Sequence, residues 1–409
     1  MTSIFTHRFD NGLWLLAEPV PGAQSLAMSL LTPAGLSREP QGQQGVAPLL
    51  AEMINRGAGD LDARAHNDAL DYLGINRGTS VETHHLNISA TMIGSQVSRA
   101  LPLLFDMVLR PMLAESALEP SRDLALQSLD ALDDEPQQKV FIELRHRHYG
   151  EPFGRSPLGK REDIEKVSIG DVRSYAKTAF VPSGSILGFA GKFDWNHLKD
   201  QVGGLTASWK GGIEPYDTPS RGARGYTHQT ADTTQVHIGL AYDALPETSE
   251  NSIYQRAAVA VLSGGMSGRL FTEVREKRGL CYSVYASYTA GKTRGSVFSY
   301  AGTTAPRAQE TLDVLTGEMR RLAEGIKEDE FTRAIVGMKS RLVMQGESTH
   351  SRAHAIAFDQ YLFGRPRSLD ELSKRVDAVK LADVNRFVQE NPPPPMTLVT
   401  IGPSALEWK

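Results

Sequence analysis

Hydrophobic and polar positions along the chain follow a period of about 2 residues where strands are expected and about 3.6 where helices are expected. In the first half, the pattern predicts a hairpin over 7–19 and a buried strand over 25–33. A helix over 42–55 follows, with Val46, Leu50 and Met53 on its apolar face. The other elements expected in this half are helices over 63–73, 95–109, 120–134, 140–148 and 169–179, and strands over 75–82, 84–92 and 185–190.

The same order of elements returns in the second half of the chain. Residues 209–233 are rich in Gly, Pro, Thr and Arg without sustained periodicity, which is typical of a linker. After it, QVHIGLAYDAL is similar to SLAMSLLTPAG, and the last strand MTLVTIG is similar to SILGFAG. We therefore predict an α+β fold with internal duplication. Its two homologous domains, over 1–208 and 234–409, are each expected to hold a mostly antiparallel sheet covered by helices.

Composition excludes several classes of function. The 409 residues carry a net charge of -4, so no polyanion-binding surface and no nucleic-acid partner are expected. The only cysteine, Cys281, excludes an intramolecular disulfide and has no neighbouring histidine that favours a nucleophile. No apolar run approaches the roughly 18 residues of a membrane span, and the N-terminus lacks a signal-peptide pattern. We expect no membrane span and a cytoplasmic protein.

One stretch, SGGMSGRLFTEVREKRGLCYSVYASY over 263–288, carries candidate chemistry. A helix after the glycine pair is expected to end at Gly279, and a strand to follow with Tyr282 on the same face as Val284. Arg275 and Tyr282 would then converge on one point, where a guanidinium and a phenol can stabilise a carbonyl oxygen under attack. Alternatively, Arg275 only complements the helix dipole and Tyr282 belongs to the core.

The run RLFTEVREKRGLCYSVYA resembles the C-terminal signature of the pitrilysin and mitochondrial processing peptidase family, the inverted zincins. In that family an Arg and a Tyr seven positions apart assist at the zinc site, which implies this role for Arg275 and Tyr282. DNGLWLLAEPVPGAQS and YGEPFGRSPLG resemble the family in the first half, so the resemblance covers essentially the whole chain. It also implies that Asn76 lies on the edge strand that pairs with an extended peptide.

The zinc motif of active members, H-x-x-E-H, is degenerate in this chain. The matching helix reads GVAPLLAEMINRG, which puts Pro48 and Glu52 at the histidine positions and Ala51 at the general-base position. The family's third ligand is a glutamate, and the matching positions in this chain hold Gln127 and Ser128. A proline has no backbone N–H, so it also removes an intrahelical hydrogen bond and bends the helix unless it lies in the first turn. No metal site is therefore expected in this chain, and His66 is expected to be a solvated helix residue.

These observations leave three functions open. We expect the chain to be the non-zinc subunit of a heteromeric processing-peptidase-like enzyme, inactive as a metalloprotease alone. Its partner would be a homologous subunit that bears H-x-x-E-H and zinc, and its substrate an extended peptide. Alternatively, the chain is a structural or peptide-binding scaffold without catalysis, and a homodimer in isolation is compatible with either function. The absent ligands argue against an independently active metalloprotease.

Overall fold

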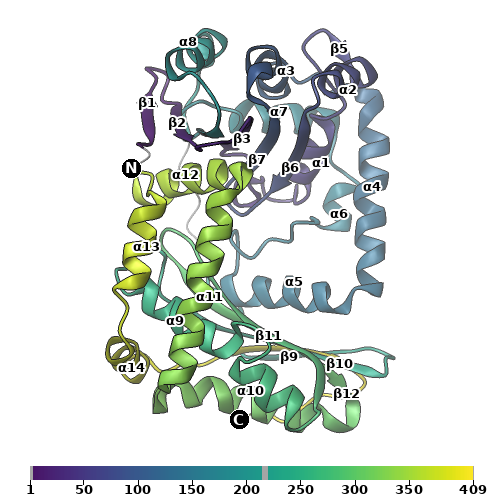
Figure 1. Cartoon of the computed structure of the whole chain (residues 1–409). Helices are drawn as coiled ribbons and strands as arrows, with labels where there is room; N and C mark the ends of the chain where they lie inside the picture. The colour runs from purple at the N-terminus through teal and green to yellow at the C-terminus, as the bar shows by residue number, and fades with distance from the viewer. Residues whose placement is uncertain (1–2, 214–219, 409) are drawn as a thin grey trace. The chain divides into compact units, whose positions relative to one another are not determined.

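Figure 1 shows the computed structural model, which describes residues 3–213 and 220–408. Residues 214–219, within the segment expected as a linker, lie outside the described residues. The chain divides into two compact units. The first contains residues 1–131, 151–220 and 345–368, and the second contains residues 132–150, 221–344 and 369–409.

The first unit is built on a six-stranded sheet with the order β1-β2-β8-β3-β7-β6. All neighbouring strands are antiparallel except β2 and β8, which are parallel. Strand β6 forms one edge of this sheet. The strands are β1 (Phe5–Arg8), β2 (Trp14–Pro19), β3 (Ser25–Thr32), β6 (Asn76–Val81), β7 (Leu86–Ile93) and β8 (Ile186–Gly191), and a separate small hairpin is formed by β4 (Gly57–Ala58) and β5 (Leu61–Asp62).

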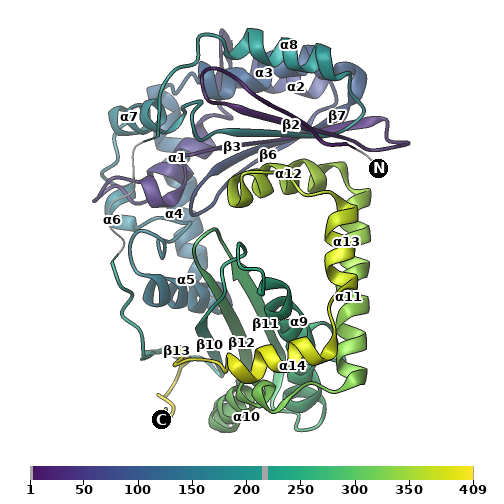
Figure 2. The same cartoon turned by 90° about the vertical axis from the view of Figure 1, so that its left-hand side faces the viewer.

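Helices cover both faces of this first sheet, as Figure 2 shows. Alternate strand residues point to opposite faces, so Leu15 joins the main core while Leu16 packs on the other side with Ile356 of α12. The main core lies between the sheet and most of the unit's helices. The helices are α1 (Val46–Met53), α2 (Ala63–Tyr72), α3 (Val97–Leu109), α4 (Leu118–Asp130), α6 (Arg161–Ile164), α7 (Ile169–Ala179), α8 (Trp195–Thr206) and α12 (Thr349–Phe363).

The second unit is built on a five-stranded sheet with the order β11-β12-β10-β13-β9. Only β13 and β9 are parallel. Its strands are β9 (Tyr226–Thr230), β10 (Gln235–Ala244), β11 (Cys281–Ala290), β12 (Gly295–Thr304) and β13 (Thr397–Gly402). Its helices are α5 (Pro136–Tyr149), α9 (Ser252–Ser263), α10 (Ala308–Arg321), α11 (Glu328–Glu347, whose last residues belong to the first unit), α13 (Leu369–Asp377) and α14 (Leu381–Glu390).

Five strands of the first sheet have the same order as the five strands of the second, as an internal duplication predicts. The order β2-β8-β3-β7-β6 in the first unit matches β9-β13-β10-β12-β11 in the second, and the single parallel pair falls at the same place. The predicted fold class, two α+β domains with mostly antiparallel sheets, is confirmed. By this match, β6 and β11 occupy the same edge position in their sheets.

Each half of the sequence contributes one helix to the compact unit built mainly from the other half. Helix α12, late in the chain, packs on β3 and β8 of the first unit, whereas α5, early in the chain, packs on β10 and β13 of the second. A glycine allows the close approach in both cases. A Cβ on Gly188 would lie 2.3 Å from the Ala353 carbonyl oxygen of α12, and one on Gly239 would lie 2.3 Å from Val140 of α5.

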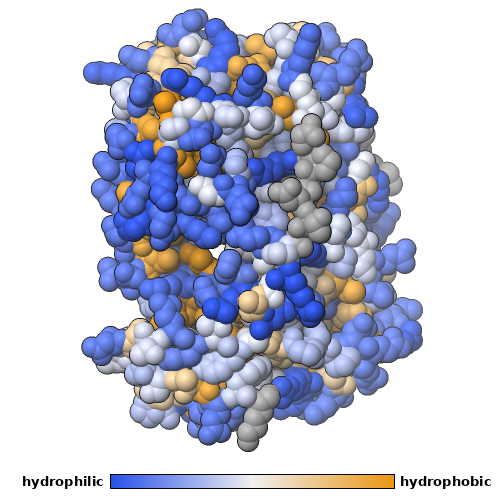
Figure 3. Space-filling view, turned by 180° about the vertical axis from the view of Figure 1, so that it is seen from behind, coloured by the Kyte–Doolittle hydropathy of each residue, from blue (hydrophilic) through white to orange (hydrophobic). Residues whose placement is uncertain are grey.

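Hydrophilic residues predominate on the face drawn in Figure 3, where hydrophobic residues form separate groups. Single exposed apolar side chains are normal for a folded protein. None of the described helices combines the length and apolarity that crossing a bilayer requires.

Candidate functional site

A short helical turn positions the candidate pair in the second unit. The helix after the glycine pair has π geometry over Phe271–Glu276, and single π turns occur often at functional sites. Gly279 ends it in the left-handed conformation, with φ of 59°. The Gly279 N–H donates to the Arg275 carbonyl oxygen and the Leu280 N–H to the Val274 carbonyl oxygen, each at 3.0 Å. The predicted role of Gly279 as terminator is confirmed.

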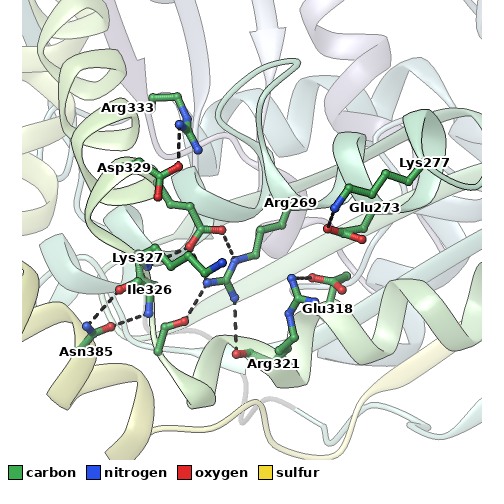
Figure 4. A network of polar contacts seen from close by, with 12 residues as sticks. Arg269, Glu273, Lys277, Glu318, Arg321, Ile326, Lys327, Asp329, Arg333 and Asn385 are labelled. Carbon is green, nitrogen blue, oxygen red and sulfur yellow. Dashed lines mark hydrogen bonds and ion pairs between the residues drawn. The ribbon is translucent and has the colours of Figure 1, made fainter.

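The start of this turn is fixed by the buried guanidinium of Arg269, shown in Figure 4. Arg269 donates to both carboxylate oxygens of Glu330 at 2.7 Å, and to the Gly325 carbonyl oxygen at 2.7 Å. A bidentate pair of this kind fixes geometry more strictly than a single contact does. The polypeptide that leads into the turn is therefore held to α11 and to the loop before it.

Arg275 lies between two aromatic rings. Its guanidinium carbon is 4.7 Å from the ring centroid of Phe271 and 5.2 Å from that of Tyr282. Both distances are within the range of cation–π attraction. Neither an ion pair nor a polar contact joins the Arg275 side chain to the described part of the chain. Its charge is thus held in place by rings but not neutralised by a carboxylate.

Tyr282 faces solvent, which corrects the expectation that it shares a face with Val284. Strand β11 has a bulge here, because Cys281 pairs with Thr303 and Ser283 already pairs with Gly302. The bulge turns the side chain of Tyr282 outward, where it is 84% exposed, while Val284 stays buried. Bulges beside functional sites commonly redirect one side chain in this way. The core alternative for Tyr282 is therefore wrong, and its ring meets Arg275 as the sequence predicted.

The neighbouring cysteine does not have the environment of a nucleophile. Cys281 is buried in the core of the second unit. Burial raises the pKa of its thiol to about 11, although nearby Arg275 acts in the opposite direction. Because the thiolate is the reactive form, this thiol is unreactive near neutral pH.

In the first unit, Asn76 is the first residue of the edge strand β6, and its side chain is exposed. It borders a pocket of about 550 Å³, which we call the β6 pocket. Its lining comes from the end of α1, the start of α2 and the start of β6. The lining residues are Glu52, Asn55, Arg56, Ala63, Asn67, Ile75, Asn76 and Arg77.

The positions matched to zinc ligands do not fit a metal ion. Glu52 is the only carboxylate among them, and it is ion-paired with Arg56 at 2.8 Å. Pro48 lies in the first turn of α1, where it costs no intrahelical hydrogen bond, so it does not disturb the helix. Ala51 is buried, and Gln127 is exposed on α4. Within residues 3–213 and 220–408, no three His, Cys, Asp or Glu side chains form a group able to hold a metal.

His66 differs from its expected setting, because it is fully buried instead of solvated. Its Nε2 lies 3.1 Å from the Leu103 carbonyl oxygen on α3. The helix α2 therefore turns this polar residue into the core, which an isolated helical pattern does not reveal.

Two residues that contact the predicted site residues, Phe271 and Arg56, were not among the sequence predictions. Phe271 precedes Arg275 by four residues, and Arg56 follows Glu52 by four. Residues at this spacing are neighbours on a helix surface, so the signal was present in the sequence. The structure brings Arg275 and Tyr282 together in the second unit, and Glu52 and Asn76 around one pocket in the first.

Two family models match the chain. Residues 15–159 match the model "Insulinase (Peptidase family M16)", and residues 166–338 match "Peptidase M16 inactive domain". An "Uncharacterized zinc protease YmxG" of Bacillus subtilis is 26% identical over 405 residues, which cover 97% of both chains. An "Uncharacterized zinc protease" of Rickettsia bellii is 24% identical and covers 98% of this chain and 97% of its own length.

Solved structures with the same fold include the "peptidase M16 inactive domain" from Pseudomonas fluorescens, with a TM-score of 0.90 and 20% identity over the whole of both chains. A protease from Helicobacter pylori has a TM-score of 0.86 and 16% identity, and covers 98% of this chain and 100% of its own. At these identities the likeness establishes the fold alone.

Proposed function

Because the chain belongs to peptidase family M16, we propose that it is the non-zinc subunit of a two-part peptidase. In this assembly a homologous partner bears H-x-x-E-H and zinc, and this chain supplies Arg275 and Tyr282 to the bound peptide. The observation that carries the proposal is the contact between Arg275, in the π-helical turn, and the exposed ring of Tyr282 at the start of β11. Tyr282 is 84% exposed and so does not serve as a core residue, and no carboxylate among the described residues neutralises Arg275.

Each side chain has a distinct role in the proposal. The guanidinium of Arg275, free of carboxylates among the described residues, donates to a peptide carbonyl and fixes its orientation. The Tyr282 hydroxyl donates to the oxygen that gains negative charge when the carbonyl is attacked. Asn76 and the open edge of β6 hold an extended peptide through backbone pairing.

The degenerate zinc positions support a division of labour. A single carboxylate that is already paired with Arg56 offers no tetrahedral site, so hydrolysis would need a metal from another chain. The alternative is a scaffold that binds peptides or a partner without chemistry. The two proposals differ in whether Arg275 and Tyr282 affect turnover.

Reconstitution tests the proposal. The purified chain alone should cleave no peptide, and addition of a zinc-bearing homologue from the same organism should produce cleavage. Arg275→Ala should lower the turnover of this complex by at least ~10-fold, because it removes a positioning contact without removing the metal. Assembly, measured by ultracentrifugation, should not change.

Arg99→Ala is the matched control, because Arg99 also stacks over an exposed tyrosine, Tyr72, at 5.9 Å. This variant should keep wild-type turnover. If Arg275→Ala and Arg99→Ala complexes have the same turnover as wild type, the scaffold alternative is correct.

A further inference from the structure

The β6 pocket has an excess of positive charge. Its lining contains two guanidinium groups, Arg56 and Arg77, and one carboxylate, Glu52. Arg56 directs both Nε and Nη2 to the same oxygen of Glu52, at 3.0 and 2.8 Å. A guanidinium has five N–H donors, so this pairing leaves donors of Arg56 available.

Arg77 adds to this excess from the strand side of the pocket. It is held by Asp71 at 2.8 Å and by the Asn67 side-chain oxygen at 2.6 Å. Asp71 offsets part of the Arg77 charge, but it does not line the pocket and its side chain is 68% exposed. The amide groups of Asn67 and Asn76 provide further donors near the two guanidinium groups.

The pocket lies at the start of a strand edge that can accept a peptide. Residues of β6 form backbone hydrogen bonds with β7, and the described residues form none with its other edge. Asn76, Gly78 and Ser80 are exposed along the strand. A peptide residue paired opposite Asn76 places its side chain on the same face of the sheet as Asn76, which borders the pocket.

We propose that the β6 pocket is a subsite for a carboxylate side chain, Asp or Glu, of an extended peptide paired with β6. This inference rests on the proposed function, since both require a peptide on this edge. The carboxylate accepts hydrogen bonds from Arg56 and from the neighbouring amide groups, and the net positive lining disfavours a lysine or arginine at the same place.

The test measures the binding of blocked ten-residue peptides of Thr, Ser and Val with one central Glu, Gln or Lys to the full-length chain. Wild type should bind the Glu peptide about threefold to tenfold more tightly than the Gln peptide, and the Lys peptide most weakly. Arg56→Gln should abolish the preference for Glu. Glu52→Gln should increase it, because this variant removes the negative charge that competes for Arg56.

Arg64→Gln provides the control, because Arg64 is an exposed α2 residue that does not line the pocket. It should leave the Glu preference as in wild type. Hydrogen exchange should show protection of the β6 amides when the Glu peptide is bound. Absence of binding, equal affinity for the three peptides, unprotected β6 amides, or identical preferences in Glu52→Gln, Arg56→Gln and Arg64→Gln would each overturn the subsite.

This experiment is independent of the chemistry assigned to Arg275 and Tyr282. If the charge preference is found and Tyr282→Phe complexes cleave at the wild-type rate, the subsite stands and the proposed function fails. If the preference is missing while Tyr282→Phe lowers turnover, the subsite fails and the proposed function stands.

Discussion

Arg275 contacts two aromatic rings and no carboxylate among the described residues. Its positive charge is therefore not neutralised and can interact with a bound peptide. Phe271 reaches it from the π-helical turn, and Tyr282 reaches it from the bulge in β11. The sequence spacing predicted that Arg275 and Tyr282 converge. It did not predict the bulge, because Leu280, Val284 and Ala286 alternate in the sequence as they would in a regular strand, and that pattern contains no mark of an extra residue.

The reactivity of Cys281, next to Tyr282, tests whether the start of β11 is buried in the core of the second unit. With its pKa raised to about 11 by burial, the thiol should react with iodoacetamide at pH 8 at least ~100-fold more slowly in the folded protein than in urea. Because the chain contains one cysteine, mass spectrometry reads the reaction without ambiguity. Equal rates in the folded and unfolded states would show that this part of β11 is open.

Glu39 gives the first unit a pH-dependent stability. Its carboxylate accepts hydrogen bonds from the Gly45 and Ala47 N–H groups, at 2.9 and 3.1 Å, at the start of α1. Burial raises the pKa of Glu39 from 4.5 to about 7, despite these donors. The folded state therefore binds the proton more tightly than the unfolded state. The resulting stability is fully present below pH 4.5 and is lost as the pH rises to about 7.

We predict that the contribution of Glu39 to the free energy of unfolding falls by up to ~3 kcal/mol over this range. Glu39→Gln, which does not titrate, should remove this part of the pH dependence in urea unfolding measured between pH 4.5 and 7. Glu115→Gln, at an exposed glutamate, is the control and should behave as wild type. The same pH dependence in Glu39→Gln and wild type would contradict the assignment.

At the scale of elements, the strands and helices expected from periodicity are present, but their partners were not predictable. The helix expected over 140–148 corresponds to α5, and its Val140 and Leu144 are buried as an apolar face requires. Periodicity shows that one face of a helix is buried, but it does not show which of the two sheets that face contacts. The predicted first domain, 1–208, therefore included α5, whereas this helix packs on β10 and β13 of the second unit. Likewise, His84 and His85 lie before β7 instead of in it, and both rings contact Tyr361 of α12.

Substitution of the glycines that contact α12 and α5 should lower the stability of the protein. Gly188→Ala places a Cβ 2.3 Å from a backbone oxygen of α12, and Gly239→Ala places one 2.3 Å from Val140 of α5. Each substitution should lower the free energy of unfolding by about 1–3 kcal/mol, as overpacked cores do. Gly204→Ala in α8 has open space around it and should stabilise the protein by about 0.5–1 kcal/mol. Equal effects at the three positions would contradict the close packing.

At the scale of the whole molecule, the exchange of α5 and α12 couples the folding of the two halves of the sequence. We predict that fragments 1–208 and 234–409 do not fold separately, because each lacks the helix that covers one face of its sheet. Each fragment alone should bind the dye ANS through that uncovered apolar face. Co-expression should restore a complex without ANS binding. Two fragments that each unfold cooperatively without dye binding would contradict the coupling. The expected boundary at 209–233 itself stays a prediction.

Arg275 and Tyr282 are proposed to take part in peptide hydrolysis by the assembled enzyme. The most direct test is the turnover of a complex between this chain and a zinc-bearing homologue in which Tyr282 is changed to Phe. This change removes one hydroxyl donor from an 84% exposed ring and leaves the ring over Arg275. Tyr72→Phe is the matched control, since Tyr72 is 82% exposed and lies under Arg99. Turnover should be ~10²–10³-fold lower for the Tyr282→Phe complex and equal to wild type for the Tyr72→Phe complex; wild-type turnover in both complexes would show that the Tyr282 hydroxyl takes no part in hydrolysis.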